Sequence, residues 1–453
     1  MTQDDMQTDL KRLAEALIHK AQRAGADQAD ALAMRGQSVS IDVRGGALEQ
    51  AERAEGVEIG LRVLIGGRQA CVSSSDHSDD AIARMAERAV AMAKEAPVDD
   101  YLGLADPDQL TARRDAAGLD LCDHISEPSP AELQDMALRA EAAALQAKGI
   151  SQVEAASAAF SRRGLWLAAT NGFSGGYGRS THAISAVAIT GEGLGMERDY
   201  AAESRVFAAD LPPAEDIGAL AAERTLARAG SRKPPTGAFP ILYDRRVASS
   251  LIAHLLGAVN GGAVARGASW LRKAMDEQVL PVGMDLTEDP LRPRYPSSRP
   301  FDAEGLATRQ RGIIRDGVLR EWTLDLATGR KLGLDSTGSA ARGLTSAPSP
   351  TNSNIRLTPG TATQAELIAG MGRGLVVTSM LGASINGTTG DYSRGAAGFW
   401  VENGQIAYPV NECTIAGNLR EMLMTLTAAN DALPWRAHEV PSLLVQGMTV
   451  AGA

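Results

Sequence analysis

The chain has 453 residues but little cysteine, only Cys71, Cys122 and Cys413. The set is odd in number and widely spaced, and no CxxC pair occurs, which predicts free thiols in a reducing compartment. The sequence also lacks any run of about 18 apolar residues that could span a membrane. Its first residues, MTQDDMQTDLKRL, are polar and acidic where a secretory signal needs a basic start and an apolar stretch. We therefore expect a soluble cytoplasmic protein without membrane association.

Basic residues are outnumbered, because 45 Lys and Arg stand against 55 Asp and Glu, which gives a formal net charge of -10. Nucleic-acid binding draws on clustered cations, so this balance argues against DNA or RNA as a partner. Hydrophobic residues make up 44% of the chain and charged residues 22%, which excludes a disordered chain. There is enough apolar surface for a large core, and the length predicts two or three domains.

Histidines in a metal-binding arrangement are also missing. The six histidines are His19, His77, His124, His182, His254 and His438. A zinc protease needs two imidazoles on one helix face and a carboxylate base, yet no two of these histidines lie within five residues of each other. The pair His438-Glu439 resembles the start of such a motif, but Pro441 prevents the helix that would supply a second histidine. The sequence therefore assigns no catalytic residue and no metal ligand to this chain.

Motifs for phosphate binding or nucleophilic catalysis are weak. The stretch Gly175 to Gly178 lacks the GK[ST] ending of a P-loop, and Gly191-x-Gly193-x-Gly195 has the wrong spacing for a dinucleotide fingerprint. Tight turns between strands explain both segments better. No GxSxG elbow occurs, although a Ser/His/Asp triad built from distant residues stays open.

The first half of the chain alternates between helical and strand patterns. Residues 5–24 repeat apolar side chains with a helical period, and residues 39–43 and 57–65 alternate with a period of two. A helix is expected at 78–95, and Ser129 opens another with a proline and a capping-box glutamate. Strands at 151–207, broken by turn-rich glycine segments, and a helix from 214 follow. The repeated order of helix, strands and helix suggests two similar halves.

A Pro, Gly and basic stretch at 231–240 is the predicted linker between an N-terminal α/β domain (1–230) and a C-terminal domain (241–453). The second domain should be mainly antiparallel β, with two-residue hairpin turns at Asp316-Gly317 and Asn403-Gly404. Its one prominent helix is expected at 244–260. The fold class is therefore α+β, with an antiparallel sheet and flanking helices in the first domain.

His254 lies on one face of this predicted helix, together with apolar residues. The periodicity groups it with Val247, Leu251, Leu255 and Ala258. This position favours an imidazole in the core or at an interface over a catalytic one.

The segment from Gly387 to Asn418 combines many glycines with a polar cluster that includes Asp391, Tyr392 and Arg394. Turn glycines and core aromatics account for part of this pattern. The polar cluster also suits a groove that receives a peptide backbone as an added strand. We therefore treat these three residues as possible contacts with a peptide or a partner.

GDYSRGAAGFWVENG within this segment resembles the most characteristic stretch of the PmbA (TldE) branch of the TldD/PmbA family. FDAEG at 301–305, TNSNIRLTPG at 351–360 and GLVVTSMLG at 374–382 agree with it. The resemblance covers essentially the whole chain, most firmly from residue 240 onward.

The resemblance implies a heterodimeric metalloprotease that cleaves unfolded or modified peptides. In such a complex the TldD-like partner carries a zinc ion on an HExxxH helix and takes a further ligand from its C-terminal region. The matching helix here spans 245–262 and has neither the histidine pair nor the glutamate, and His254 lies beside the motif as a neighbour of a vestigial site. The C-terminal region also lacks the corresponding cysteine. The expected function is thus a non-catalytic, metal-lacking subunit, with zinc in the TldD-like partner.

Two alternatives stay open. The chain could be a self-sufficient metallopeptidase of the same family that acts as a homodimer, with a metal held by scattered residues such as His182, His254 and His438. It could instead be a regulatory binding protein, since an older label of the family refers to modulation of DNA gyrase.

Overall fold

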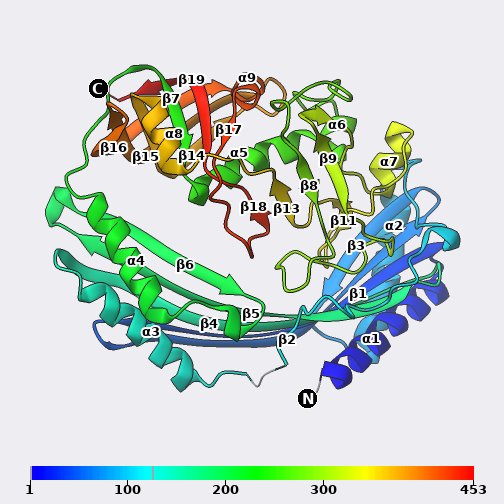
Figure 1. Cartoon of the computed structure of the whole chain (residues 1–453). Helices are drawn as coiled ribbons and strands as arrows, with labels where there is room; N and C mark the ends of the chain where they lie inside the picture. The colour runs from blue at the N-terminus through cyan, green and yellow to red at the C-terminus, as the bar shows by residue number, and fades with distance from the viewer. Residues whose placement is uncertain (1–2, 125–126, 453) are drawn as a thin grey trace.

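The computed structural model describes residues 3–124 and 127–452, and a long antiparallel sheet forms its base (Figure 1). The sheet has six strands in the order β3-β2-β1-β4-β5-β6. These strands are β1 (Gln28–Arg44), β2 (Ala47–Ile65), β3 (Arg68–Ser74), β4 (Ile150–Ala169), β5 (Ser174–Thr190) and β6 (Glu197–Arg205). The helices of this half are α1 (Gln3–Ala24), α2 (Asp79–Glu95), α3 (Pro130–Leu145) and α4 (Ala214–Ala227), with short 3-10 turns at Pro107–Gln109, Gly193–Gly195 and Ala208–Asp210.

The two faces of this sheet have different neighbours. Along β1, Ala31 and Ala33 pack with α1 and α2, and Ile41 packs with α3 and α4, so the four helices share one face. Leu32 alternates with them and points to the other face, as the period of two in a strand requires. The C-terminal half of the chain occupies this second, concave face (Figure 1).

The sheet consists of two sets of elements in the same order. α1, β1, β2, β3 and α2 form one set, and α3, β4, β5, β6 and α4 form the other. β1 and β4 pair antiparallel at the centre, from Asp30 opposite Ala169 to Val43 opposite Ala156. The helix–strands–helix order that the sequence suggested twice is therefore present twice in the fold.

Most predicted turns and caps agree with the structure. Asp316-Gly317 and Asn403-Gly404 have positive φ angles, 50° and 77° in the first pair and 53° and 73° in the second, which is the backbone of two-residue hairpin turns. Ser129 caps α3 with the predicted capping box. These predictions succeeded because each depends on residues close together in the sequence.

One turn prediction was wrong. Gly175 to Gly178 lie inside β5 and not in a turn between strands. A Cβ atom at Gly176 would lie 2.4 Å from Trp166 Cε3 and 2.6 Å from Gln7 Oε1. These glycines therefore allow close packing within a strand, whereas the Gly193–Gly195 segment does form the expected turn.

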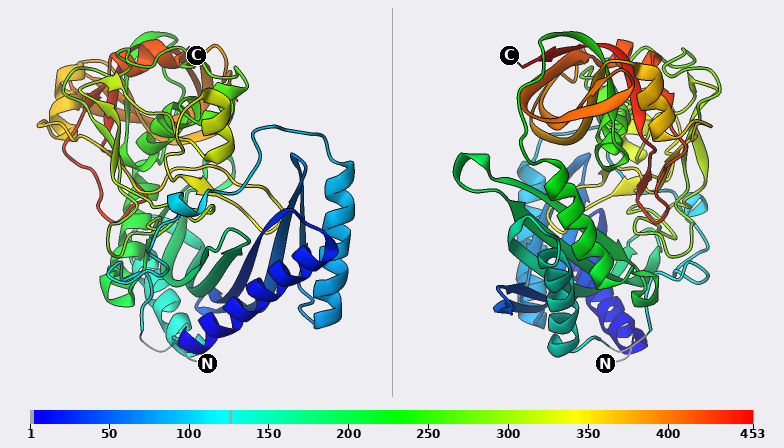
Figure 2. Two further views of the ribbon diagram at one scale, coloured as in Figure 1. Left: turned by 90° about the vertical axis from the view of Figure 1, so that its right-hand side faces the viewer. Right: turned by 60° about the vertical axis from the view of Figure 1, so that its left-hand side comes forward.

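Beyond α4 the chain builds a closed barrel from strands distant in sequence. The order β16-β15-β14-β7-β19 closes because β16 also pairs with β19, and β17 extends the sheet beyond β19. The strands are β7 (Gly237–Tyr243), β14 (Gly374–Ile385), β15 (Asp391–Glu402), β16 (Gln405–Asn418), β17 (Thr427–Ala428) and β19 (Leu443–Ala451). They curl round at the top of the molecule in the right-hand view of Figure 2. Only the β7–β14 contact in the barrel is parallel.

A smaller sheet of five strands lies beside the barrel, in the order β10-β9-β8-β13-β18. Its strands are β8 (Leu286–Glu288), β9 (Arg311–Arg315), β10 (Val318–Leu319), β13 (Ile355–Leu357) and β18 (His438–Glu439). The other elements are α5 (Arg245–Ala258), α6 (Gly261–Ala265), α7 (Leu326–Leu332), α8 (Gln364–Met371), α9 (Leu419–Met424), β11 (Ala340–Ala341) and β12 (Ser349–Pro350). A single hydrophobic core joins the barrel, α5 and the smaller sheet. The α+β class, with a β-rich C-terminal half and a prominent helix at α5, is confirmed.

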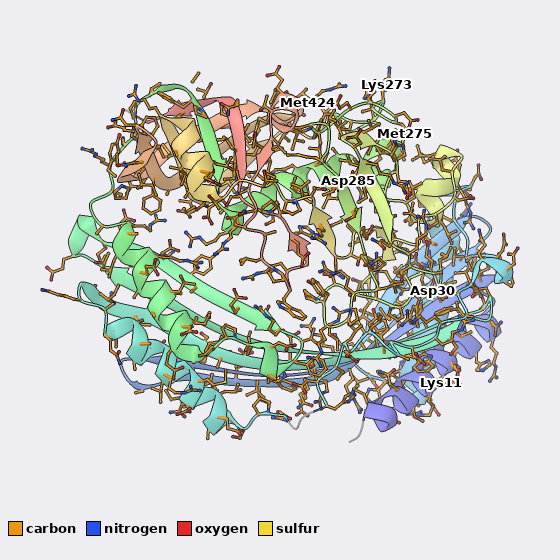
Figure 3. The ribbon with its side chains drawn as sticks, in the orientation of Figure 1. Lys11, Asp30, Lys273, Met275, Asp285 and Met424 are labelled. Atoms are coloured by element: carbon orange, nitrogen blue, oxygen red, sulfur yellow. The ribbon has the colours of Figure 1, made fainter. Side chains whose placement is uncertain are left out.

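Buried polar and aromatic contacts join the two halves of the chain. Arg342 pairs with Asp30 on β1, and Phe301 packs edge-on against Phe173 and Tyr177 at centroid distances of 5.0 and 5.5 Å. Figure 3 shows Asp30 where β1 faces the C-terminal half, while Lys11 lies on α1 on the opposite side of the sheet. Chain segments on either side of the predicted 231–240 linker thus share an extensive interface.

Cys71, Cys122 and Cys413 are all free thiols, as predicted. Within the described residues, no helix combines the length and the apolar character needed to cross a membrane.

Candidate functional site

The candidate site is built around α5, the helix that the sequence singled out. Asp244 caps its N-terminus by accepting a hydrogen bond from the Arg246 N–H, at 2.9 Å. Leu251 and Leu255 lie on its buried face, as predicted, and anchor the helix in the C-terminal core. The helix packs against β7 and β14, so its side chains reach the barrel wall.

His254 on α5 is half-buried and faces the barrel. Its ring lies 5.9 Å from the ring of Tyr392 on β15, at an interplanar angle of 73°. Its Nε2 atom is buried and has no hydrogen-bond partner among the described residues. Burial lowers the pKa of His254, and the positive charge of Arg394 lowers it further. The imidazole is therefore held neutral, and its Nε2 atom is available to a further partner.

Two tyrosines line the same region from β7 and β15, the two strands on either side of β14. The hydroxyls of Tyr243 and Tyr392 donate to the sulfur atoms of Met448 and Met380, both at 3.5 Å. Burial raises the pKa of both phenols, most strongly that of Tyr243, so both stay protonated near neutral pH. Sequence reasoning missed Tyr243, because nothing in the local pattern links a buried strand tyrosine to a helix that follows it.

The three predicted contact residues differ in exposure. Asp391 is exposed, and its carboxylate accepts hydrogen bonds from the Thr389 hydroxyl at 2.6 Å and the Asn418 amide at 3.2 Å, which lower its pKa. Arg394 is partly exposed and donates from Nε to the Gly382 carbonyl at 2.9 Å. Tyr392 is only 2% exposed and belongs to the core.

A partly open strand edge borders these residues. β14 pairs with β7 only from Leu375 to Val377, while its pairing with β15 continues to Ile385. In the described part of the chain, the remainder of β14 thus has a neighbouring strand on one side only. Leu381 in this stretch is 73% exposed, and Thr378 has a buried hydroxyl oxygen without a hydrogen-bond partner among the described residues. An open edge with an exposed apolar side chain can accept a further strand.

The residues around His254 do not fit a zinc ion. One turn away on α5, the positions that should offer further ligands hold Ser250 and Ala258. His182 lies on β5 beside Asp123 and His438 lies on β18, and no metal-binding group in the described part of the chain unites them with His254. Across residues 3–124 and 127–452, no group of three or more His, Cys, Asp or Glu is placed to hold a metal. The nearby Arg394 charge also opposes a cation at this position.

A closed barrel that packs against α5 and rests on a duplicated antiparallel sheet defines an α+β protein. Profiles of one protein family match three consecutive parts of the chain. The profiles described as PmbA/TldA metallopeptidase domain 1, central domain and C-terminal domain match residues 29–93, 123–229 and 236–452. The chain therefore belongs to the PmbA/TldD metallopeptidase family, and the family assignment made from sequence motifs is confirmed.

Two related proteins are similar in sequence to this chain over nearly its full length. The chain is 38% identical to the Metalloprotease PmbA of Escherichia coli O157:H7 over 428 residues, which cover 94% of this chain and 92% of that protein. It is 34% identical to a Metalloprotease PmbA homolog of Haemophilus influenzae, with 98% and 96% of the two chains covered.

Solved structures share the fold. A Bacteroides thetaiotaomicron protein described as a candidate modulator of DNA gyrase superposes with a TM-score of 0.90 at 27% identity, covering 98% of this chain and 99% of that chain. TldE from Thermococcus kodakarensis superposes with a TM-score of 0.84 at 18% identity, covering 97% and 99%, and supports the fold alone.

Proposed function

We propose that this chain is the non-catalytic, metal-lacking subunit of a heterodimeric metalloprotease that cleaves unfolded or modified peptides. A TldD-like partner supplies the zinc ion and the general base, and this chain helps to enclose and guide the peptide. The complex acts in the cytoplasm, where the three free thiols of this chain stay reduced.

The observation that carries the proposal is the environment of His254. A catalytic zinc needs about three protein ligands, and α5 offers one imidazole with Ser250 and Ala258 one turn away. Arg394 adds a positive charge where a cation would need negative or neutral donors. The few possible metal ligands around His254 therefore favour a non-catalytic role for this chain within a metalloprotease.

Contact with the peptide or the partner is assigned to the open part of β14 and the start of β15. A strand added at this edge would pair its backbone with β14, and it would meet the exposed side chain of Leu381. Asp391 and Arg394 supply one negative and one positive side chain nearby, and buried Tyr392 holds the start of β15 against His254.

The test is to purify this chain alone, the TldD-like chain alone and the co-expressed pair. Native mass spectrometry reports the assembly, elemental analysis reports the zinc content, and hydrolysis of an unfolded peptide reports activity. We expect a 1:1 heterodimer with one zinc ion bound by the partner, and hydrolysis that requires the partner. His254→Ala should leave the zinc content of the pair unchanged.

The homodimer alternative predicts a different result. In that case this chain alone binds stoichiometric zinc and hydrolyses the peptide, and His254→Ala removes both properties. That outcome would overturn the proposal.

A further inference from the structure

A cavity of about 480 Å³ lies between the two halves of the chain, at the N-terminal end of α5. Its walls come from β6, α4, the first turns of α5 and residues 433–440. His254 lies further along α5 and is not among its lining residues. The cavity is therefore separate from the site beside the barrel.

Four arginines and one carboxylate line this cavity. Arg246 donates to both oxygens of Asp199, at 3.0 and 3.3 Å, and Arg436 pairs with Glu203. Each of these two guanidinium groups therefore has a carboxylate partner. The other two arginines, Arg224 and Arg245, have different surroundings.

Arg224 and Arg245 have only neutral acceptors. Arg224 donates to the Tyr200 carbonyl at 3.0 Å and Arg245 to the Asp431 carbonyl at 3.4 Å, and neither forms a salt bridge within the described residues. Burial lowers the pKa of Arg224, and the neighbouring charge of Arg246 lowers it further. Asp199 and Asp244 partly oppose this lowering, and Arg245 is exposed to solvent. The cavity thus offers two guanidinium groups that no ion pair within the described residues occupies, and an anion can bind to them.

Tyr200, Ser249 and His438 also line the cavity, and several apolar side chains complete it. Ile217 and Leu220 on α4 form one side of the cavity, and Leu433 and Val440 contribute from the segment that leads to β19. A ligand that matches this surface has an anionic group for the arginines and an apolar body for these side chains. Free inorganic phosphate would satisfy only the first requirement.

We propose that this cavity binds a small oxyanion, a carboxylate or a phosphate, carried on an apolar group. Arg224 and Arg245 bind the oxyanion, and the leucine and isoleucine side chains hold the apolar body. A C-terminal residue of a peptide and a small phosphate ester both have this chemistry. The site belongs to this chain alone and does not depend on the proposed role in a heterodimer.

The experiment measures binding to the isolated full-length chain by isothermal titration calorimetry. N-acetylleucine tests the carboxylate source, phenyl phosphate tests the phosphate source, and N-acetylleucinamide keeps the apolar body without the charge. We expect at least one of the two anions to bind and the amide to bind at least about tenfold more weakly, because a charge-assisted hydrogen bond is lost. Equal binding of the amide, or no binding of either anion, would refute the site.

Matched variants locate the binding. Arg224→Gln and Arg245→Gln should each weaken the anion about tenfold or more. Arg88→Gln, an equal change of charge at an exposed position on α2, should leave binding unchanged. Arg224→Lys keeps the charge and should restore part of the affinity, which separates loss of charge from loss of folding. If Arg224→Gln and Arg245→Gln both bind the anion as well as Arg88→Gln does, the assignment is wrong.

Discussion

Arg342 forms a buried ion pair with Asp30, and this contact joins the C-terminal half of the chain to the first strand of the N-terminal sheet. Both side chains are almost fully buried, 1% and 3% exposed. Asp30 also accepts a hydrogen bond from Arg62 Nε at 2.6 Å, so one carboxylate serves two guanidinium groups from different halves. The pair therefore contributes to how the two halves are held together.

Arg342→Met tests this contact. Removing one partner of a buried ion pair typically costs about 3 kcal/mol, and the remaining Arg62 pair should keep the loss near this value or below it. We expect a clear drop in the thermal unfolding midpoint. Arg309→Met removes a more exposed pair with Glu321 and should cost less than about 1 kcal/mol. Equal midpoints for the two variants would contradict a structural role for the Asp30 contact.

The folding stability of the chain should depend on pH through the buried carboxyl group of Glu304. Burial raises its pKa to about 8, helped by Asp302 and Asp325 and opposed by Arg62. Between its ordinary pKa and about 8 the folded chain keeps a proton that the unfolded chain has released, so the stability contribution of Glu304 falls as pH rises through this window.

Glu304→Gln cannot ionise and keeps an oxygen for the Leu326 N–H, which Glu304 accepts at 2.9 Å. Its unfolding midpoint should match the wild type near the ordinary carboxyl pKa and exceed it above about pH 8. Exposed Glu223→Gln serves as the control and should shift the midpoint little at either pH. A constant difference between Glu304→Gln and wild type across pH would refute the titration.

Gly176 in β5 allows a close approach that no side chain permits. A Cβ atom there would lie 2.4 Å from Trp166 Cε3 and 2.5 Å from the Leu165 carbonyl oxygen. Gly176→Ala should therefore destabilise the chain by about 2 kcal/mol. Gly36→Ala is the matched strand control, because its Cβ would meet no atom within 4 Å, and it should be neutral or slightly stabilising. Denaturant unfolding of the two variants measures the difference.

Local residue patterns predicted much of the fold but only part of the candidate site. The helix at α5, the capping box at Ser129 and the turn at Asn403-Gly404 depend on neighbours in sequence, so spacing was sufficient. Closure of the barrel through β16 and β19, and the position of Tyr243 beside Tyr392, depend on pairings between distant segments. No periodicity encodes these long-range contacts, and glycines that permit packing within a strand look the same in sequence as glycines in turns.

His254→Leu tests the buried imidazole. Burial and the charge of Arg394 lower the pKa of His254, so below its ordinary pKa the unfolded chain binds a proton that the folded chain resists, and stability is lost as pH falls. The variant removes this term and the unpartnered Nε2, so it should be about 1 kcal/mol more stable at neutral pH and gain more toward pH 5. Exposed His19→Leu is the control for the same substitution at a surface position. A slope equal to that of wild type in His254→Leu would show that His254 does not titrate as described.

Leu381→Lys tests the open part of β14 as the contact with the partner or the peptide. Leu381 is 73% exposed in the stretch of β14 that lacks β7 beside it, so a lysine there adds charge without disturbing the core. Val282→Lys is the matched control, because Val282 is 71% exposed and lies outside the barrel. In the mixture with a TldD-like chain, burying a new charge at the contact should reduce heterodimer formation or peptide hydrolysis about tenfold or more, while Val282→Lys leaves both unchanged.

Native mass spectrometry and a hydrolysis assay separate the two effects. Loss of the heterodimer assigns the edge to the partner, and loss of hydrolysis in an intact heterodimer assigns it to the peptide. If Leu381→Lys behaves like Val282→Lys in both measurements, the open edge of β14 is not the contact surface.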